Sequence, residues 1–80
     1  MRIDLLLSRL GLIKRRTVAK EMTDNGLVKI NGRNAKPSQE VRPGDIIGIG
    51  GKWALTVEIT EIPGGSVKKD DRLKYYKLLS

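Results

Sequence analysis

The chain has no cysteine, no histidine and no phenylalanine among its 80 residues, and only 4% of it is aromatic. Without cysteine it has neither disulfides nor thiolate metal sites, and without histidine it lacks the commonest general base and metal ligand. No apolar run approaches the roughly 18 residues of a membrane span, and the short apolar stretch after Met1 does not make a signal peptide. We therefore expect a cytoplasmic protein that is not an enzyme and holds neither metal nor cofactor.

The positive charge is unevenly distributed along the chain. Eighty residues predict a single domain, 1–80, with a modest core, and the net charge is +7. Residues 1–42 hold ten basic and four acidic side chains, whereas residues 43–80 hold six and five. A membrane surface would attract this charge, but membrane-lying helices carry a broad apolar face with Trp or Phe, and Trp53 lies in the other half. A polyanion such as nucleic acid is the partner that this charge fits.

Two short helices are predicted in the first third of the chain. Three leucines repeat at helical spacing after Asp4, which is placed to cap or favour a helix start, and Gly11 ends the run. The second helix is predicted to begin near Arg16 or Thr17, where the Thr hydroxyl would cap it, and to end at Asn25-Gly26. Both helices are amphipathic, so their apolar faces are expected in the core.

Beyond Gly26 the periodicity changes to alternation, which predicts strands. Residues 28–30 and the turn dipeptide Asn31-Gly32 predict a β-hairpin. Residues 46–49 predict a short buried strand, and the segment from Trp53 to residue 62 predicts a half-buried one. Residues 73–79 fit a final strand or a helix, and we prefer the strand. The predicted fold class is α+β, with two short N-terminal helices packed on a small, mostly antiparallel β-sheet.

Basic side chains gather where the second helix begins. Lys14, Arg15 and Arg16 are consecutive there, and a helix N-terminus presents free N–H groups to anions. Arg16 and Lys20 are four residues apart, so they share a face that the apolar residues leave free. If the helices pack by their apolar faces and the hairpin lies against them, the basic side chains form one continuous strip on the surface. The alternative interpretation is that they are ordinary solvated charges with no binding role. The residues of that expected strip are Arg2, Arg9, Arg16, Lys20, Lys29 and Arg33.

Structured RNA is the nucleic acid that this pattern favours. A strip that neutralises about five or six phosphates would read shape and phosphate position, with binding that weakens steeply as salt rises. The stacking platforms that single strands need are missing from the basic half, since Trp53, Tyr75 and Tyr76 all lie beyond residue 50. A helix-turn-helix that binds DNA is the alternative, but a hairpin follows the two helices where a supporting third helix would be needed.

Four segments taken together resemble a known RNA-binding domain. Residues 2–4, 11–20, 25–32 and 41–47 are similar to the S-four-type domain, first described in a small-subunit ribosomal protein. The resemblance covers residues 1–50, and residues 51–80 form a strand-rich remainder. Since the motif starts with the chain and little follows it, the chain resembles the stand-alone members, which are the ribosome-associated heat-shock proteins and, more closely, the RqcP/YabO group. The resemblance implies the small alpha-L RNA-binding motif.

The resemblance also implies a function and a set of contacts. It implies binding to ribosomal RNA and tRNA on the large ribosomal subunit. In the RqcP/YabO group it also implies a role in ribosome quality control, where the protein supports tail addition to the nascent chain on large subunits obstructed by a peptidyl-tRNA. It then implies a tail-adding factor as a further partner. Arg2 and Arg16 are the expected main contacts, and Asp4 is expected to orient the helix start or Arg2. We expect a monomer. A ribosome-associated heat-shock or assembly factor, or an RNA chaperone, is the alternative. The full expected RNA-binding set is Arg2, Lys14, Arg15, Arg16, Thr17, Lys20, Lys29 and Arg33.

Overall fold

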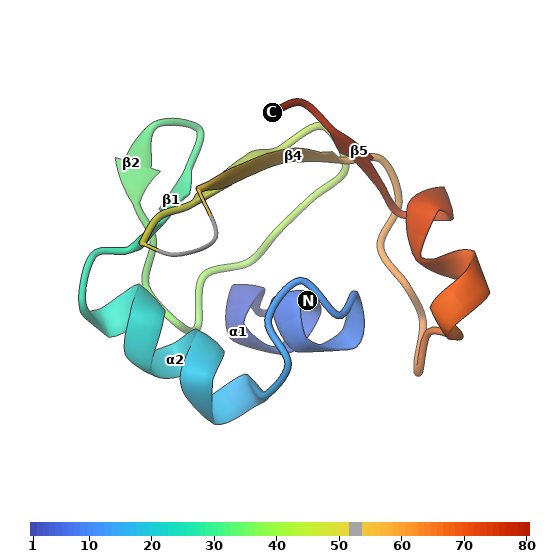
Figure 1. The fold of residues 1–80 in the computed structure, drawn as a ribbon, viewed down its shortest axis with the longest axis horizontal. Helices are drawn as coiled ribbons and strands as arrows, with labels where there is room; N and C mark the ends of the chain where they lie inside the picture. The colour runs from blue at the N-terminus through green and yellow to red at the C-terminus, as the bar shows by residue number, and fades with distance from the viewer. Residues whose placement is uncertain (52–53) are drawn as a thin grey trace.

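Two helices lie beneath one face of a five-stranded sheet in the computed structural model, which describes residues 1–51 and 54–80 (Figure 1). The strand order is β2-β1-β3-β4-β5, and every neighbouring pair is antiparallel. This arrangement confirms the predicted α+β class. The strands are β1 (Val28–Ile30), β2 (Arg33–Asn34), β3 (Ile46–Ile49), β4 (Leu55–Ile59) and β5 (Tyr76–Leu78).

The helices α1 (Ile3–Arg9) and α2 (Arg16–Asp24) end as the sequence predicts, and α2 begins at Arg16 as expected, but its cap differs. Gly11 and Gly26 have φ of +71° and +74°, the left-handed conformation that ends a helix and favours glycine. Thr17 was expected to cap α2, and this prediction is wrong: the N-cap is Arg15, with no side-chain hydrogen bond. Asp4 lies inside the first turn of α1, where its negative charge suits the helix N-terminus.

The core lies between the helices and the inner face of the sheet. Its fully buried members come from both helices and from three strands: Ile3, Leu6, Leu7, Leu10, Ala19, Val28, Ile47, Val57 and Ile59. Alternation along the strands sends Lys29 and Ile46 to the opposite face, because successive side chains of a strand point to opposite sides. The prediction of a buried 46–49 strand is therefore wrong for Ile46, which is 40% exposed.

The hairpin turn is tied to the turn that precedes β3. Asn31 and Gly32 have φ of 51° and 83°, as the two central residues of a type I′ hairpin require. The Asn31 side-chain amide donates to Asp45 Oδ1 at 3.0 Å, and its oxygen accepts the backbone N–H of Ile46 at 2.9 Å. These bonds fix where β1 turns relative to the start of β3, which adds a non-local anchor to the predicted hairpin.

The C-terminal segment folds back beside α1. A 3₁₀ helix, η1 (Lys69–Lys74), precedes β5, so the preferred final strand is confirmed and the helical alternative applies only before it. The Arg72 guanidinium lies directly over Gly11, where a Cβ atom would clash with Arg72 Cζ. Trp53, the predicted start of the half-buried strand, lies outside the described residues. Within the described residues no helix is long and apolar enough to cross a membrane.

Candidate nucleic-acid interface

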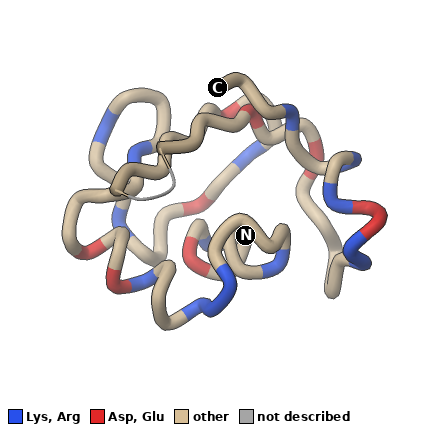
Figure 2. Tube along the Cα trace, in the orientation of Figure 1, with Lys and Arg blue, Asp and Glu red and all other residues tan. Residues whose placement is uncertain are grey.

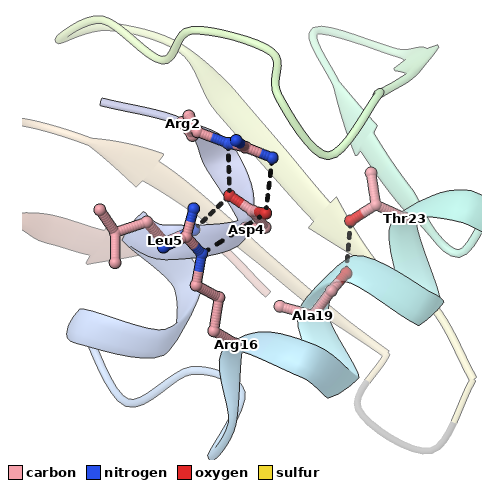
Figure 3. A network of polar contacts seen from close by, with 6 residues as sticks. All are labelled: Arg2, Asp4, Leu5, Arg16, Ala19 and Thr23. Atoms are coloured by element: carbon pink, nitrogen blue, oxygen red, sulfur yellow. Dashed lines mark hydrogen bonds and ion pairs between the residues drawn. The ribbon is translucent and has the colours of Figure 1, made fainter.

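A buried carboxylate between the two helices holds two arginines (Figure 3). Asp4 accepts two hydrogen bonds from Arg2, from Nε to Oδ1 at 3.2 Å and from Nη2 to Oδ2 at 3.1 Å. Its Oδ1 also accepts the backbone N–H of Leu5 at 2.7 Å. Arg16 Nε lies 3.6 Å from Asp4 Oδ2, so the same carboxylate forms ion pairs with both arginines.

Burial makes this carboxylate an effective anchor. The Asp4 side chain is 2% exposed, whereas those of Arg2 and Arg16 are each 46% exposed. A carboxylate removed from water is costly unless charged donors compensate it, and here two guanidinium groups and one N–H do so. The three side chains keep one net positive charge, and both arginine side chains remain about half exposed to solvent. A planar guanidinium fork matches the geometry of a phosphate group.

Arg2 and Arg16 come together through helix packing and chain pairing. Arg2 pairs with Glu40 in an isolated antiparallel bridge, and the Met1 amine donates to Glu40 Oε1 at 2.6 Å. This hydrogen bond and the positive charge of the amine hold the pKa of Glu40 below its ordinary value. On α2, Ala19 is fully buried and so allows close approach to α1, while the buried Thr23 hydroxyl donates to Ala19 O at 2.5 Å. Tertiary contacts therefore set the spacing of the two arginines.

Thr17 and Lys20 complete a hollow around this centre, which we call the α1–α2 hollow. Its lining residues are Arg2, Asp4, Arg16, Thr17 and Lys20. Lys20 follows Arg16 by one helical turn, and both are exposed on α2. The hollow thus combines three positive side chains, a hydroxyl and one buried carboxylate, an arrangement suited to binding a phosphate and giving it a defined position.

Lys14 and Arg15 lie just outside the α1–α2 hollow. Both are exposed in the loop that leads into α2, where they line a separate hollow with Ile13 and Val18. Along the chain they continue the basic surface from Arg16, as the run of basic positions at the start of α2 shows (Figure 2). Their expected place at the beginning of the second helix is confirmed by the structure.

The single continuous strip expected from the sequence does not form. Lys29 lies on the sheet face opposite the helices, because its neighbours Val28 and Ile30 are buried beneath the sheet. Arg33 pairs with Ile30 at the end of the edge strand β2 and is exposed there. Arg9 reaches the C-terminal segment, with its Nη1 3.9 Å from the Cβ position of Gly65. Strand alternation separates Lys29 from the hollow, whereas Arg33 is separated by its place on the edge strand and Arg9 by its place in the last turn of α1.

The link from Asp4 to Arg16 was missed at the level of sequence. Its signal was an acidic residue enclosed by apolar neighbours, with Ile3 before it and leucines after it. Such a residue is buried only when it has charged partners, and Arg2 was the partner expected for it. The second partner, Arg16, lies twelve positions further along the chain and meets Asp4 through the packing of α2 on α1.

Comparison with known proteins adds an independent observation. Residues 1–47, which contain the α1–α2 hollow, the hairpin and the start of β3, match the S4 domain. The RQC P-site tRNA stabilizing factor of Bacillus subtilis is 41% identical over 80 residues, covering 99% of this chain and 92% of that protein. The protein of the same name from Streptococcus pneumoniae is 41% identical over 81 residues, covering all of this chain and 91% of its own.

A solved structure has the same fold over the whole chain. Heat Shock Protein 15 of Vibrio cholerae, described as trimeric, matches with a TM-score of 0.91 and 28% identity. The match covers all of this chain and 82% of that protein. The similarity therefore extends beyond residue 47 to β4, η1 and β5.

Proposed function

We propose that this chain, which belongs to the S4 domain family and within it to the RQC P-site tRNA stabilizing factors, is an RNA-binding protein of ribosome quality control. It binds ribosomal RNA and tRNA on the large ribosomal subunit and steadies a P-site tRNA there, which supports tail addition to a stalled nascent chain. The named relatives and their coverage of the whole chain support this function. Its place of work is accordingly the cytoplasm.

The observation that carries the proposal is the pair of arginines on one buried carboxylate. Arg2 and Arg16 lie in the segment that matches the S4 domain, and Asp4 limits their motion while leaving their outer donors free. Preorganised guanidinium groups lose less entropy when they bind a phosphate than flexible surface lysines do. The proposed contacts are therefore Arg2, Arg16, Thr17 and Lys20 in the hollow, with Lys14 and Arg15 beside it. Lys29 and Arg33 would contribute from other surfaces.

Three narrower proposals accompany this function. The protein acts by binding and has no catalytic activity of its own, it acts as a monomer, and it works beside a tail-adding factor. Sedimentation equilibrium at micromolar concentration tests the oligomeric state, which is of interest because the Vibrio cholerae structure is trimeric. The likeness to that heat-shock protein also supports a second candidate, a more general role on heat-stressed ribosomes.

Co-sedimentation with purified large subunits, with and without peptidyl-tRNA, tests the proposal. We use Arg2→Gln and Arg16→Gln, since charge reversal would place a second carboxylate beside buried Asp4 and destabilise the fold. Each change should weaken binding about tenfold, the lower end of what a charge-assisted hydrogen bond contributes. Lys77→Gln is the matched control. Lys77 is exposed on β5, pairs with Glu58 on the sheet face turned away from the helices, and is not part of the α1–α2 hollow.

The outcome separates the candidates. The quality-control role requires tighter binding to subunits that carry a peptidyl-tRNA, whereas a general heat-stress factor would bind both kinds of subunit equally. If Arg2→Gln and Arg16→Gln bind like Lys77→Gln, the α1–α2 hollow is not the RNA contact.

A further inference from the structure

A second pair of arginines lies at the seam between the end of α1 and the C-terminal segment, residues 63–72. Arg9 extends from the last turn of α1 to Gly65, with Nη1 3.9 Å from the Cβ position of that glycine. Arg72 extends in the opposite direction, from η1 to Gly11, where its Nε, Cζ and Nη1 all lie within 2.7 Å of the Cβ position. Each side chain therefore reaches from one side of the seam to a glycine on the other side. This seam lies outside the α1–α2 hollow.

Neither arginine has a partner among residues 1–51 and 54–80. No hydrogen bond or ion pair joins either guanidinium to a described residue, whereas Arg2 and Arg16 share Asp4. Arg72 Nε is buried and is left without an acceptor in that part of the chain. The neighbouring acid Asp71 is engaged by Lys74 at 3.2 Å. Partly buried guanidinium groups without acceptors are costly, so an anion at the seam would stabilise them.

The end of α1 does not use these donors either. A guanidinium beside a helix C-terminus is favoured by the helix dipole, and this accounts for the position of Arg72 over Gly11. The final turns of α1 are nonetheless closed by backbone bonds, from Gly11 N to Ser8 O at 3.1 Å and from Leu12 N to Leu7 O at 3.0 Å. Apart from the buried Nε of Arg72, the guanidinium donors of Arg9 and Arg72 are the ones that a ligand at the seam would contact.

We propose that Arg9 and Arg72 form a second phosphate-binding site, which holds an RNA backbone phosphate at the seam between α1 and η1. This inference rests on the proposed RNA-binding function and adds a contact outside the α1–α2 hollow. Lys68 and Lys69 are exposed at the start of η1, the element that carries Arg72, and Figure 2 shows basic positions on either side of the acidic ones there. The seam contains Arg72, which lies beyond the residues that match the S4 domain, so the C-terminal segment takes part in binding.

Salt-dependent RNA binding tests this site. We compare wild type with Arg9→Gln, Arg72→Gln, their double variant and the control Lys77→Gln, using an RNA hairpin of ribosomal helix length. Losing one phosphate contact should lower the slope of log Kd against log salt by about 0.8 and weaken binding about fivefold at 0.15 M salt. If both arginines hold the same phosphate, the double variant should lose little more than either single one, because the two changes are coupled.

A second measurement reports on Arg72 directly, so the test does not depend on a variant that folds poorly. The buried Nε–H of Arg72 should give an NMR resonance that shifts on adding the RNA hairpin to the wild-type protein. Inorganic pyrophosphate is the comparison probe for free phosphate compounds. A shift with pyrophosphate and none with RNA would overturn the proposal and identify a site for free phosphates, and no shift with either would overturn the site altogether.

The result also distinguishes this site from the proposed function. If Arg9→Gln binds RNA like Lys77→Gln while Arg16→Gln binds weakly, the second site is refuted and the proposed function stands. If Arg16→Gln also binds normally, the proposed function itself fails. Thermal unfolding of Arg9→Gln, which leaves the Arg72 contact with Gly11 in place, should match wild type within about 2 °C, since Arg9 makes no hydrogen bond or ion pair to a described residue that the change would break.

Discussion

Replacing Asp4 with Asn separates the charge of the α1–α2 hollow from its geometry. Asn keeps one acceptor oxygen but loses the second oxygen and the negative charge that hold Arg2 and Arg16. Removing one partner of a buried ion pair costs about 3–5 kcal/mol when the other partner stays buried. Here each arginine is 46% exposed and water can solvate it, so we expect about 2 kcal/mol. For a domain of this size that lowers the Tm by about 8–16 °C.

The effect on RNA binding has a sign that discriminates between two explanations. Asp4→Asn raises the net charge by one unit above +7, so attraction between net charges alone would tighten binding to RNA. If Asp4 positions the two arginines, binding weakens in spite of the added charge, because both guanidinium groups must be ordered again when RNA binds. We expect binding about threefold to tenfold weaker, which corresponds to the entropic cost of immobilising one or two side chains.

The assay measures the affinity of the protein for the RNA hairpin at a temperature well below the Tm. Urea unfolding of the free protein is measured alongside it. Glu21→Gln is the matched control, since it removes the same charge from an exposed position on α2. Glu21→Gln should bind RNA slightly more tightly and unfold like wild type. If Asp4→Asn also binds more tightly, or unfolds at the wild-type urea concentration, the positioning role of Asp4 is wrong.

Three further predictions concern stability. Gly11→Ala should destabilise the fold more than Gly26→Ala does in urea unfolding. Both changes force alanine into a positive φ, which costs about 1–2 kcal/mol, but only Gly11 of the two lies beneath a guanidinium. Equal losses of stability would contradict that packing. Asn31→Ala removes two side-chain hydrogen bonds and should cost about 1–3 kcal/mol by the same measurement, against no more than about 0.5 for a change at exposed Asn34. The pKa of Glu40 is lowered, so its pairing with the N-terminal amine stabilises the fold above the unfolded-state pKa and this stabilisation is lost as pH falls through the folded-state pKa. Glu40→Gln should therefore be less stable than wild type at neutral pH and equally stable in acid. Unfolding measured at several pH values tests this.

The local features of the fold could be predicted because they depend on a few consecutive residues. Only glycine and a few polar residues adopt positive φ readily, so Asn31-Gly32 and the glycines after each helix mark turns whatever surrounds them. The buried faces follow from periodicity, which brought the leucines of α1 and the alternate residues of β4 to the core.

The candidate site was only partly predictable. Arg16 and Lys20 share a face of one helix, a relation that sequence spacing sets, and both line the hollow. Arg9 and Lys29 were expected beside them, but the distance between side chains on different elements depends on how those elements pack. The Thr17 cap failed for a related reason, since α2 begins two residues earlier than a Thr17 cap requires and Arg15 is the N-cap.

The sequence by itself determined which segments form helices, strands and turns, which faces are apolar, and that positive charge gathers before and within α2, since all of these follow from residue type and short-range spacing. Only the tertiary structure decided which charges meet. Asp4 reaches Arg16, Arg72 covers Gly11, and Lys29 turns to the far face, because ion pairing and burial act through space between elements distant in the chain. The buried Asp4 carboxylate therefore selects Arg2 and Arg16 from sixteen basic side chains as a preorganised pair.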